Sequence, residues 1–376
     1  MSKKIYRAAI GALFFLPGIC FASWASRIPG IQHALGLSEA QLGMVLLALP
    51  AGLMLSLPIS GFLITHVGSR KMVLVALFAY SVFLICLGLA TNIVQLCAAL
   101  FLFGLSGNMV NIAVNTQALA VEEMYKRPIM ASFHGLWSLA GFTGAAVGSL
   151  MIARNIVPVF HFLLITSIVA VTLLIAGRFT IKTDGEASGD KAFVLPDRSL
   201  LHLGLISFCG MICEGAMFDW SGIYFQKVVR PDKEWLGAGY TAVMFTMASG
   251  RFIADRFAHR YGLKTTLQTS GALIAAGLLT TVAFPRLIPS ILGFLLVGFG
   301  ISSIVPLVYS AAGKSKTMST GVALAAVSTI GFFGFLLGPP MIGLIAGWTS
   351  LRGSFLVVAC MGISVSVLSS FIRRQN

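Results

Sequence analysis

The chain has few charged residues, and acidic ones are the scarcest. Charged side chains make up 10% of its 376 residues, with only 12 Asp and Glu in total, whereas an average soluble protein is about 25% charged. Hydrophobic side chains make up 57%, so most of the chain cannot face water. The composition excludes a soluble globular fold and indicates an integral membrane protein.

The sequence also lacks the motifs of ATP-driven pumps and of common hydrolases. It contains no Gly-x-x-x-x-Gly-Lys-Ser/Thr loop, no His-Glu-x-x-His and no Gly-x-Ser-x-Gly arrangement. Cys209 and Cys213 share a helix face, but no His or further Cys follows at metal-ligand spacing. We therefore expect a protein that is not an enzyme, holds no cofactor or metal, and draws its energy from gradients.

Long apolar runs fill almost the whole chain. A helix needs about 20 apolar residues to cross the hydrocarbon core of a membrane. The sequence predicts twelve such helices and leaves almost nothing for a soluble domain. They are expected at residues 8–25, 41–64, 72–90, 94–115, 130–152, 158–177, 200–224, 236–254, 266–284, 287–311, 321–345 and 353–371.

The net charge of +14 reflects membrane topology. When the N-terminus is placed in the cytoplasm, most of the 26 Lys and Arg residues fall in cytoplasmic loops, as the positive-inside rule requires. No basic patch interleaved with aromatic residues remains to indicate a nucleic-acid partner. Both termini are expected in the cytoplasm, and the lipid bilayer is the expected surrounding.

The start of the chain resembles a signal peptide. Lys3, Lys4 and Arg7 precede an apolar run, which ends in the small residues of Ala22–Ser26. Cleavage would remove the first of the twelve helices. We expect this helix to be retained, because the internal repeat described next needs it.

Two halves of the chain resemble each other. A basic turn bracketed by glycines at residues 61–71 has a counterpart at residues 250–264, and a glycine triplet recurs with the same spacing: Gly141, Gly144, Gly148 and Gly331, Gly334, Gly338. Two halves that run in the same direction indicate parallel repeats related by an axis along the membrane normal. We expect six-helix bundles at residues 1–178 and 199–376, joined by a cytoplasmic linker at 179–198.

On these features the chain resembles the major facilitator superfamily over essentially its whole length. The signature of that family is a Gly-x-Leu-Ala-Asp-Arg-x-Gly-Arg-Lys turn between the second and third helices. The first copy here has Thr65 in place of the Asp; it matches at Gly61, Leu63, Gly68, Arg70 and Lys71. The resemblance implies twelve transmembrane helices in two pseudo-symmetric six-helix bundles.

The second copy of the turn keeps the acid, as Asp255 followed by Arg256. The resemblance implies that this Asp lies against a helix N-terminus and, with nearby Arg side chains, closes the cytoplasmic gate. The alternative is a basic loop that only obeys the positive-inside rule. That alternative accounts for Arg70 and Lys71 but leaves Asp255 unexplained, so we favour a gate.

Several helices resemble one branch of the family, the uncharacterised bacterial permeases related to fucose permease. The resemblance is carried by residues 24–29, 111–117, 134–141, 214–221 and 306–310. It implies a monomer in the bacterial inner membrane. The fucose site itself is not expected, because the first and fourth helices contain no acid.

Polar side chains inside the first half are candidates for binding cargo. Asn108, Asn111 and Asn115 fall on one helix face, where they either join helices by hydrogen bonds or line a wet cavity. His134 and Trp137 share a face of the next helix. His134 either takes part in proton coupling, since histidine titrates near neutral pH, or makes an interhelical hydrogen bond.

Glu214 and Asp219 are the two acids inside the seventh helix. A carboxylate there costs roughly 2.5 to 3.5 kcal/mol without compensation, and no Lys or Arg is expected at the depth of Glu214, since Arg251 is assigned to the cytoplasmic turn. We therefore expect Glu214 to be protonated at rest and to carry protons. Asp219 is expected at the outer rim, where Arg27 is a possible partner.

Trp220 and Tyr224 follow on the same helix. They are candidates for cargo binding, with anchoring in the outer aromatic belt as the alternative. The sequence thus predicts a proton-coupled secondary transporter of a small polar, sugar-like metabolite that works by alternating access. A proton-driven exporter of amphiphilic compounds and a non-transporting sensor or assembly partner remain the alternatives.

Overall fold

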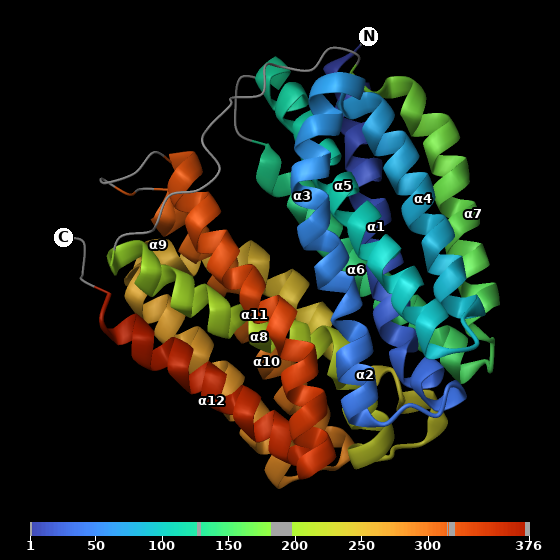
Figure 1. Ribbon diagram of the computed structural model, residues 1–376. Helices are drawn as coiled ribbons and strands as arrows, with labels where there is room; N and C mark the ends of the chain where they lie inside the picture. The colour runs from blue at the N-terminus through green and yellow to red at the C-terminus, as the bar shows by residue number, and fades with distance from the viewer. Residues whose placement is uncertain (1, 126–128, 182–197, 314, 316–319, 373–376) are drawn as a thin grey trace. The chain divides into compact units, whose positions relative to one another are not determined.

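The computed structural model describes residues 2–125, 129–181, 198–313, 315 and 320–372. Every regular element in these residues is helical (Figure 1). The α-helices are α1 Lys3–Ala34, α2 Glu39–Leu46, α3 Ala48–Val67, α4 Ser69–Leu89, α5 Ile93–Tyr125, α6 Met130–Ala153, α7 Pro158–Ala176, α8 Arg198–Tyr224, α9 Ala238–Ala283, α10 Leu287–Ala312, α11 Thr320–Trp348 and α12 Leu351–Ser370; the short helices are η1 Gly177–Phe179, η2 Phe225–Val229 and η3 Lys233–Trp235.

Eleven helices of the described residues are long and apolar enough to cross a membrane. One of them belongs to α9, where two helical runs meet at the non-helical Gly262. The eighth and ninth expected spans both lie within this helix. The expected all-α membrane fold is therefore confirmed.

The chain divides into two compact units. The first contains Met1–Leu37 and Val45–Ala187, and the second contains Ser38–Met44 and Ser188–Asn376. Most of the expected linker, residues 182–197, lies outside the described residues. The start of α2 groups with the second unit because its backbone at Gly43 lies against Pro339 and Gly343 of α11.

The same helix pairing builds each unit. In the first, α1 packs on α6; in the second, α8 packs on α11. Glycines make both contacts close: a Cβ added at Gly144 would lie 3.0 Å from the carbonyl oxygen of Ile19, and one added at Gly334 would lie 2.3 Å from that of Phe208. Small residues of this kind let helix backbones approach each other. Members of both glycine triplets found in the sequence thus act in packing.

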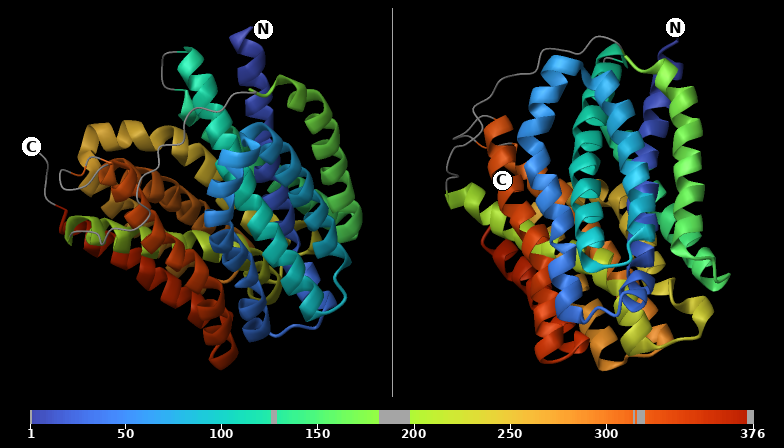
Figure 2. Two further views of the ribbon diagram at one scale, coloured as in Figure 1. Left: turned by 45° about the horizontal axis from the view of Figure 1, so that its top comes forward. Right: turned by 45° about the vertical axis from the view of Figure 1, so that its right-hand side comes forward.

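Figure 2 shows α4 and α7 running side by side in the first unit. The helices of this unit extend beyond the apolar runs that predicted them. Helix α1 continues to Ala34 and α5 to Tyr125, so Arg27 lies within a helix rather than in an outer loop. The first polar residues after an apolar run mark where the apolar sequence ends. The helix itself can continue beyond them.

The two expected basic turns are much shorter than the sequence suggested. Helix α3 continues to Val67 and α4 begins at Ser69, so that Gly68 alone, with φ of 83°, separates them. In the second unit Gly262 has φ of 81° inside α9. This left-handed region favours glycine because it has no Cβ. The break expected between the helices at 236–254 and 266–284 is thus reduced to Gly262.

A basic residue two positions after each of these glycines binds the end of another helix. Arg70 Nη2 donates to the carbonyl oxygen of Gly177, 3.4 Å away, just beyond α7. Lys264 Nζ donates to the carbonyl oxygen of Ser370 at the end of α12. Cations stabilise helix C-termini, where carbonyl groups lack partners. Each of the two residues thus ties its turn to the last long helix of its own unit.

Close backbone contact between α3 and α5 provides a test of this packing. A Cβ at Gly104 would lie 2.0 Å from the carbonyl oxygen of Leu49, whereas a Cβ at Gly30 would meet nothing within 4 Å. We expect Gly104→Ala to destabilise the protein by about 1–3 kcal/mol through overpacking. The matched control Gly30→Ala should leave the melting temperature in detergent unchanged or raise it, because Ala favours a helix. Equal melting temperatures for the two variants would contradict the close approach.

Candidate functional site

Glu214 forms an ion pair inside the second unit. Its Oε1 lies 3.4 Å from Nη2 of Arg251, and the two side chains are 11% and 24% exposed. The expectation that no Lys or Arg lies at the depth of Glu214 was therefore wrong. Counting Arg251 with the basic turn at 250–264 places it at the cytoplasmic surface, whereas in α9 its side chain reaches Glu214 of α8.

Two hydroxyl groups accompany this ion pair. The side chain of Tyr309 on α10 lies within electrostatic reach of Glu214 and shares a hydrogen bond with Ser328 on α11. Four helices of one unit, α8 to α11, thus contribute a carboxylate, a guanidinium and two hydroxyls. Such a group can hold a proton and bind the oxygen atoms of a ligand. The sequence analysis did not single out Tyr309 or Ser328, although both are polar residues within apolar runs.

Asp219 lies further along α8 and is 7% exposed. Tyr240 of α9 is close enough for the charge of Asp219 to act on it, and its hydroxyl has no hydrogen-bond partner among the described residues. The expected pairing of Asp219 with Arg27 joins residues of two different units and stays a prediction. Within its own unit, Asp219 lies in a second polar group that is separate from the Glu214 pair.

A buried basic pair occupies the first unit. Arg27 of α1 is 5% exposed, and its Nε donates to Nδ1 of His161 on α7 at 3.2 Å. Neither Nη2 of Arg27 nor Nε2 of His161 has a hydrogen-bond partner in the part of the chain that the structure describes. A buried guanidinium bonded to a neutral imidazole favours an anion or another acceptor nearby. Sequence analysis missed His161, which is the single ionisable residue in the run at 158–177.

The asparagine stripe separates into two groups. Asn108 is 5% exposed and donates to Oγ of Ser56 at 2.6 Å, which joins α5 to α3. Nδ2 of Asn115 donates to Oδ1 of Asn111 at 3.0 Å, one turn away on the same helix. The contacts of Asn108 favour the helix-joining alternative, whereas Asn111 is exposed and available to a ligand.

His134 and Trp137 lie on α6 and are not fully buried. The His134 side chain is exposed, and its ring lies 5.4 Å from that of Phe14, edge to face. Trp137 is half-buried and lies against Gly18 of α1. Both remain candidates for contact with cargo or protons.

The two aromatic candidates on α8 are core residues. Trp220 and Tyr224 are both 0% exposed. The Tyr224 hydroxyl donates to the carbonyl oxygen of Thr281 at 3.1 Å, and its ring stacks on Phe355 at 4.2 Å. These contacts favour a structural role for Tyr224 over cargo binding.

The expected gate residues are only partly described. Gly61 lies in α3 and Gly68 at the break that follows, and Arg70 binds the end of α7. Lys71 and Arg256 are exposed, and the side chain of Asp255 lies outside the described side chains. The assignment of these residues to a gate stays a prediction.

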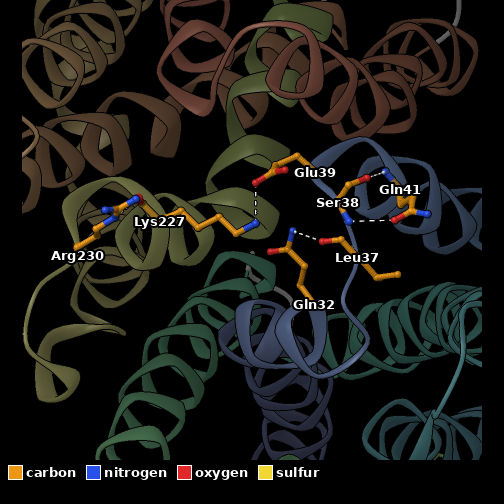
Figure 3. A network of polar contacts seen from close by, with 7 residues as sticks. All are labelled: Gln32, Leu37, Ser38, Glu39, Gln41, Lys227 and Arg230. Atoms are coloured by element: carbon orange, nitrogen blue, oxygen red, sulfur yellow. Dashed lines mark hydrogen bonds and ion pairs between the residues drawn. The ribbon is translucent and has the colours of Figure 1, made fainter.

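Figure 3 shows polar contacts around the start of α2 that the sequence analysis missed. Lys227 Nζ lies 2.6 Å from Oε1 of Glu39 at the start of α2. Ser38 and Gln41 exchange hydrogen bonds of 3.0 and 3.2 Å between backbone and side chain. The Ser-x-x-Gln spacing is a capping box, so this helix start was readable from the sequence. The ion pair is partly exposed and contributes little stability.

Comparisons with known proteins agree with this architecture. The model of the Major Facilitator Superfamily matches residues 9–322. An uncharacterised MFS-type transporter of Yersinia pestis is 30% identical over 100% of both chains. An uncharacterised transporter of Sinorhizobium fredii is 32% identical over 97% of both, and the membrane protein MosC of Rhizobium meliloti is 30% identical over 100% of this chain and 92% of its own.

Solved structures show the same fold at low identity. The nucleoside transporter NupG superposes with a TM-score of 0.78 at 12% identity, over 98% of this chain and 100% of its own. A bacterial homologue of the human lysosomal transporter Spinster gives a TM-score of 0.74 at 12% identity, over 98% of this chain and 96% of its own. The narrower resemblance to the relatives of fucose permease stays a prediction.

The Glu214 pair predicts a specific pattern of stabilities. Arg251→Gln leaves the buried carboxyl group of Glu214 without its partner, and breaking a fully buried pair in this way costs about 3–5 kcal/mol of unfolding free energy. Because Arg251 is 24% exposed, we expect the free energy of unfolding to fall by a smaller amount, about 1–3 kcal/mol. The double variant Glu214→Gln/Arg251→Gln should recover most of this loss in a thermal melt at neutral pH. If the stability loss of the double variant equals the sum of the losses of the two single variants, the two side chains do not interact.

Proposed function

The chain belongs to the major facilitator superfamily and is a multi-pass secondary transporter, and on this premise we propose that it moves a small polar metabolite together with protons. We place it in the bacterial inner membrane, working as a monomer by alternating access. Parallel repeats of this kind move against each other around a central site. The matched packing of α1 with α6 and of α8 with α11 supports two units of equivalent construction.

The ion pair between Glu214 and Arg251 carries the proposal. When Glu214 is charged, its carboxylate compensates the guanidinium. When Glu214 takes up a proton, the pair loses its attraction and Arg251 can donate to a further acceptor oxygen. A hydroxyl, carbonyl or carboxylate oxygen of the cargo supplies it. Proton uptake and cargo binding then favour each other, and thermodynamic linkage makes this effect reciprocal.

The structure narrows the set of cargo contacts that we propose. In the second unit Tyr309 and Ser328 join Glu214 and Arg251, while Tyr224 is removed because its hydroxyl is held by a backbone carbonyl. In the first unit we retain the accessible candidates: Asn111, Asn115, His134 and Trp137. Oxygen acceptors and amide or hydroxyl donors of this kind suit a sugar-like molecule.

Replacement of Glu214 tests proton coupling. A thermal-shift screen of metabolites at mildly acidic and neutral pH first identifies a stabilising ligand. In liposomes with an imposed pH gradient, Glu214→Gln should abolish uphill accumulation of that ligand, because the site can no longer change its charge. Exchange of the labelled ligand across the membrane without a gradient should persist.

Asp219→Asn is the matched control, because it removes a second buried carboxyl group from the same helix. We expect it to retain uphill transport. Unchanged accumulation by the Glu214→Gln variant would exclude Glu214 from coupling. If the wild-type protein moves no stabilising ligand under any gradient, a sensor is the better interpretation.

A further inference from the structure

A groove opens in the first unit where α1 begins and α5 ends. Its volume is about 850 Å³, and side chains of α1, α5, α6 and α7 line it. The interior is apolar and includes Ala12, Phe15, Leu16, Phe133, Leu136 and Ile168. Ligand pockets span about 300–1,000 Å³, so the groove has room for part of an acyl chain.

The mouth of the groove is basic. Lys4 and Arg7 lie there together with Tyr125 and Ser132. Arg7 Nη2 donates to Oγ of Ser132 at 3.3 Å, and the guanidinium lies 5.6 Å from the centre of the Tyr125 ring. These two contacts hold the cation at the mouth. None of the described residues that line the groove is acidic, so the mouth complements an anion.

The position of this mouth identifies the source of the anion. The positive-inside rule places the N-terminal end of α1 at the cytoplasmic surface. That surface of a membrane carries anionic lipids, and basic pockets between transmembrane helices bind their headgroups. An apolar groove that continues from a basic mouth matches an acyl chain joined to a phosphate.

We propose that this groove binds an anionic phospholipid of the cytoplasmic leaflet. The phosphate lies between Lys4 and Arg7 and accepts hydrogen bonds from these two cations, while Ser132 holds the Arg7 guanidinium in place. One acyl chain follows the apolar side chains between α1, α6 and α7. The site lies wholly within the first unit and does not involve the Glu214 pair, so it is independent of the proposed transport mechanism.

Lipid binding to the full chain in detergent tests this site. The probes are phosphatidylglycerol, phosphatidylcholine with the same acyl chains, and glycerol phosphate, each followed by native mass spectrometry and thermal shift. We expect phosphatidylglycerol to bind most tightly and to raise the melting temperature. Each of Lys4→Gln and Arg7→Gln should weaken its binding about fivefold, in line with the contribution of one cation near an anionic surface, and Arg7→Lys should retain most of it.

Two further variants separate the groove from general surface charge. Ala12→Phe fills the apolar interior and should weaken both phospholipids. Lys71→Gln removes an exposed cation that does not line the groove, and it should have no effect. Equal binding of the two phospholipids, unaffected by Lys4→Gln and Arg7→Gln, would overturn the headgroup assignment. Binding of glycerol phosphate as tight as that of phosphatidylglycerol would indicate a free phosphate site and overturn the lipid proposal.

Discussion

Compensation of buried charge is the constraint on which the arrangement of the polar residues depends. A charge inside an apolar chain must meet an opposite charge, a hydrogen-bond partner or a proton, because the hydrocarbon cannot solvate it. In the second unit Glu214 meets Arg251. In the first, Arg27 donates to the ring of His161. One unit thus holds an ion pair, and the other holds a cation bonded to a neutral partner.

The membrane fold was predictable because the apolar runs and the similarity between the two halves can both be read directly from the sequence. The apolar runs located the helices, and the glycine triplets indicated the internal repeat; the pairing of α1 with α6 and of α8 with α11 comes from the structure. The ends of the helices were not predictable in the same way. Arg27 lies within α1 although the apolar run that predicts this helix ends at residue 25, because a helix can continue beyond such a run.

The candidate site was only partly predictable. Glu214 was identified because an acid in an apolar run is costly, but its partner Arg251 is 37 residues away and was hidden by the assignment of a loop. The spacing of Asn108 and Asn111 correctly placed both on one helix, yet only tertiary contacts show that Asn108 binds Ser56. A pattern can identify a face of a helix, whereas the neighbouring helix decides what each side chain on that face does.

Infrared difference spectroscopy tests the opening of the Glu214 pair most directly. Acidification of the detergent-purified protein should produce the carbonyl band of a protonated carboxylic acid, and Glu214→Gln should remove that band. In Arg251→Gln the same band should already be present at neutral pH, because the charge that favours the carboxylate is gone. If Glu214→Gln leaves the acid-induced bands unchanged, Glu214 does not take up the proton and the proposed coupling is wrong.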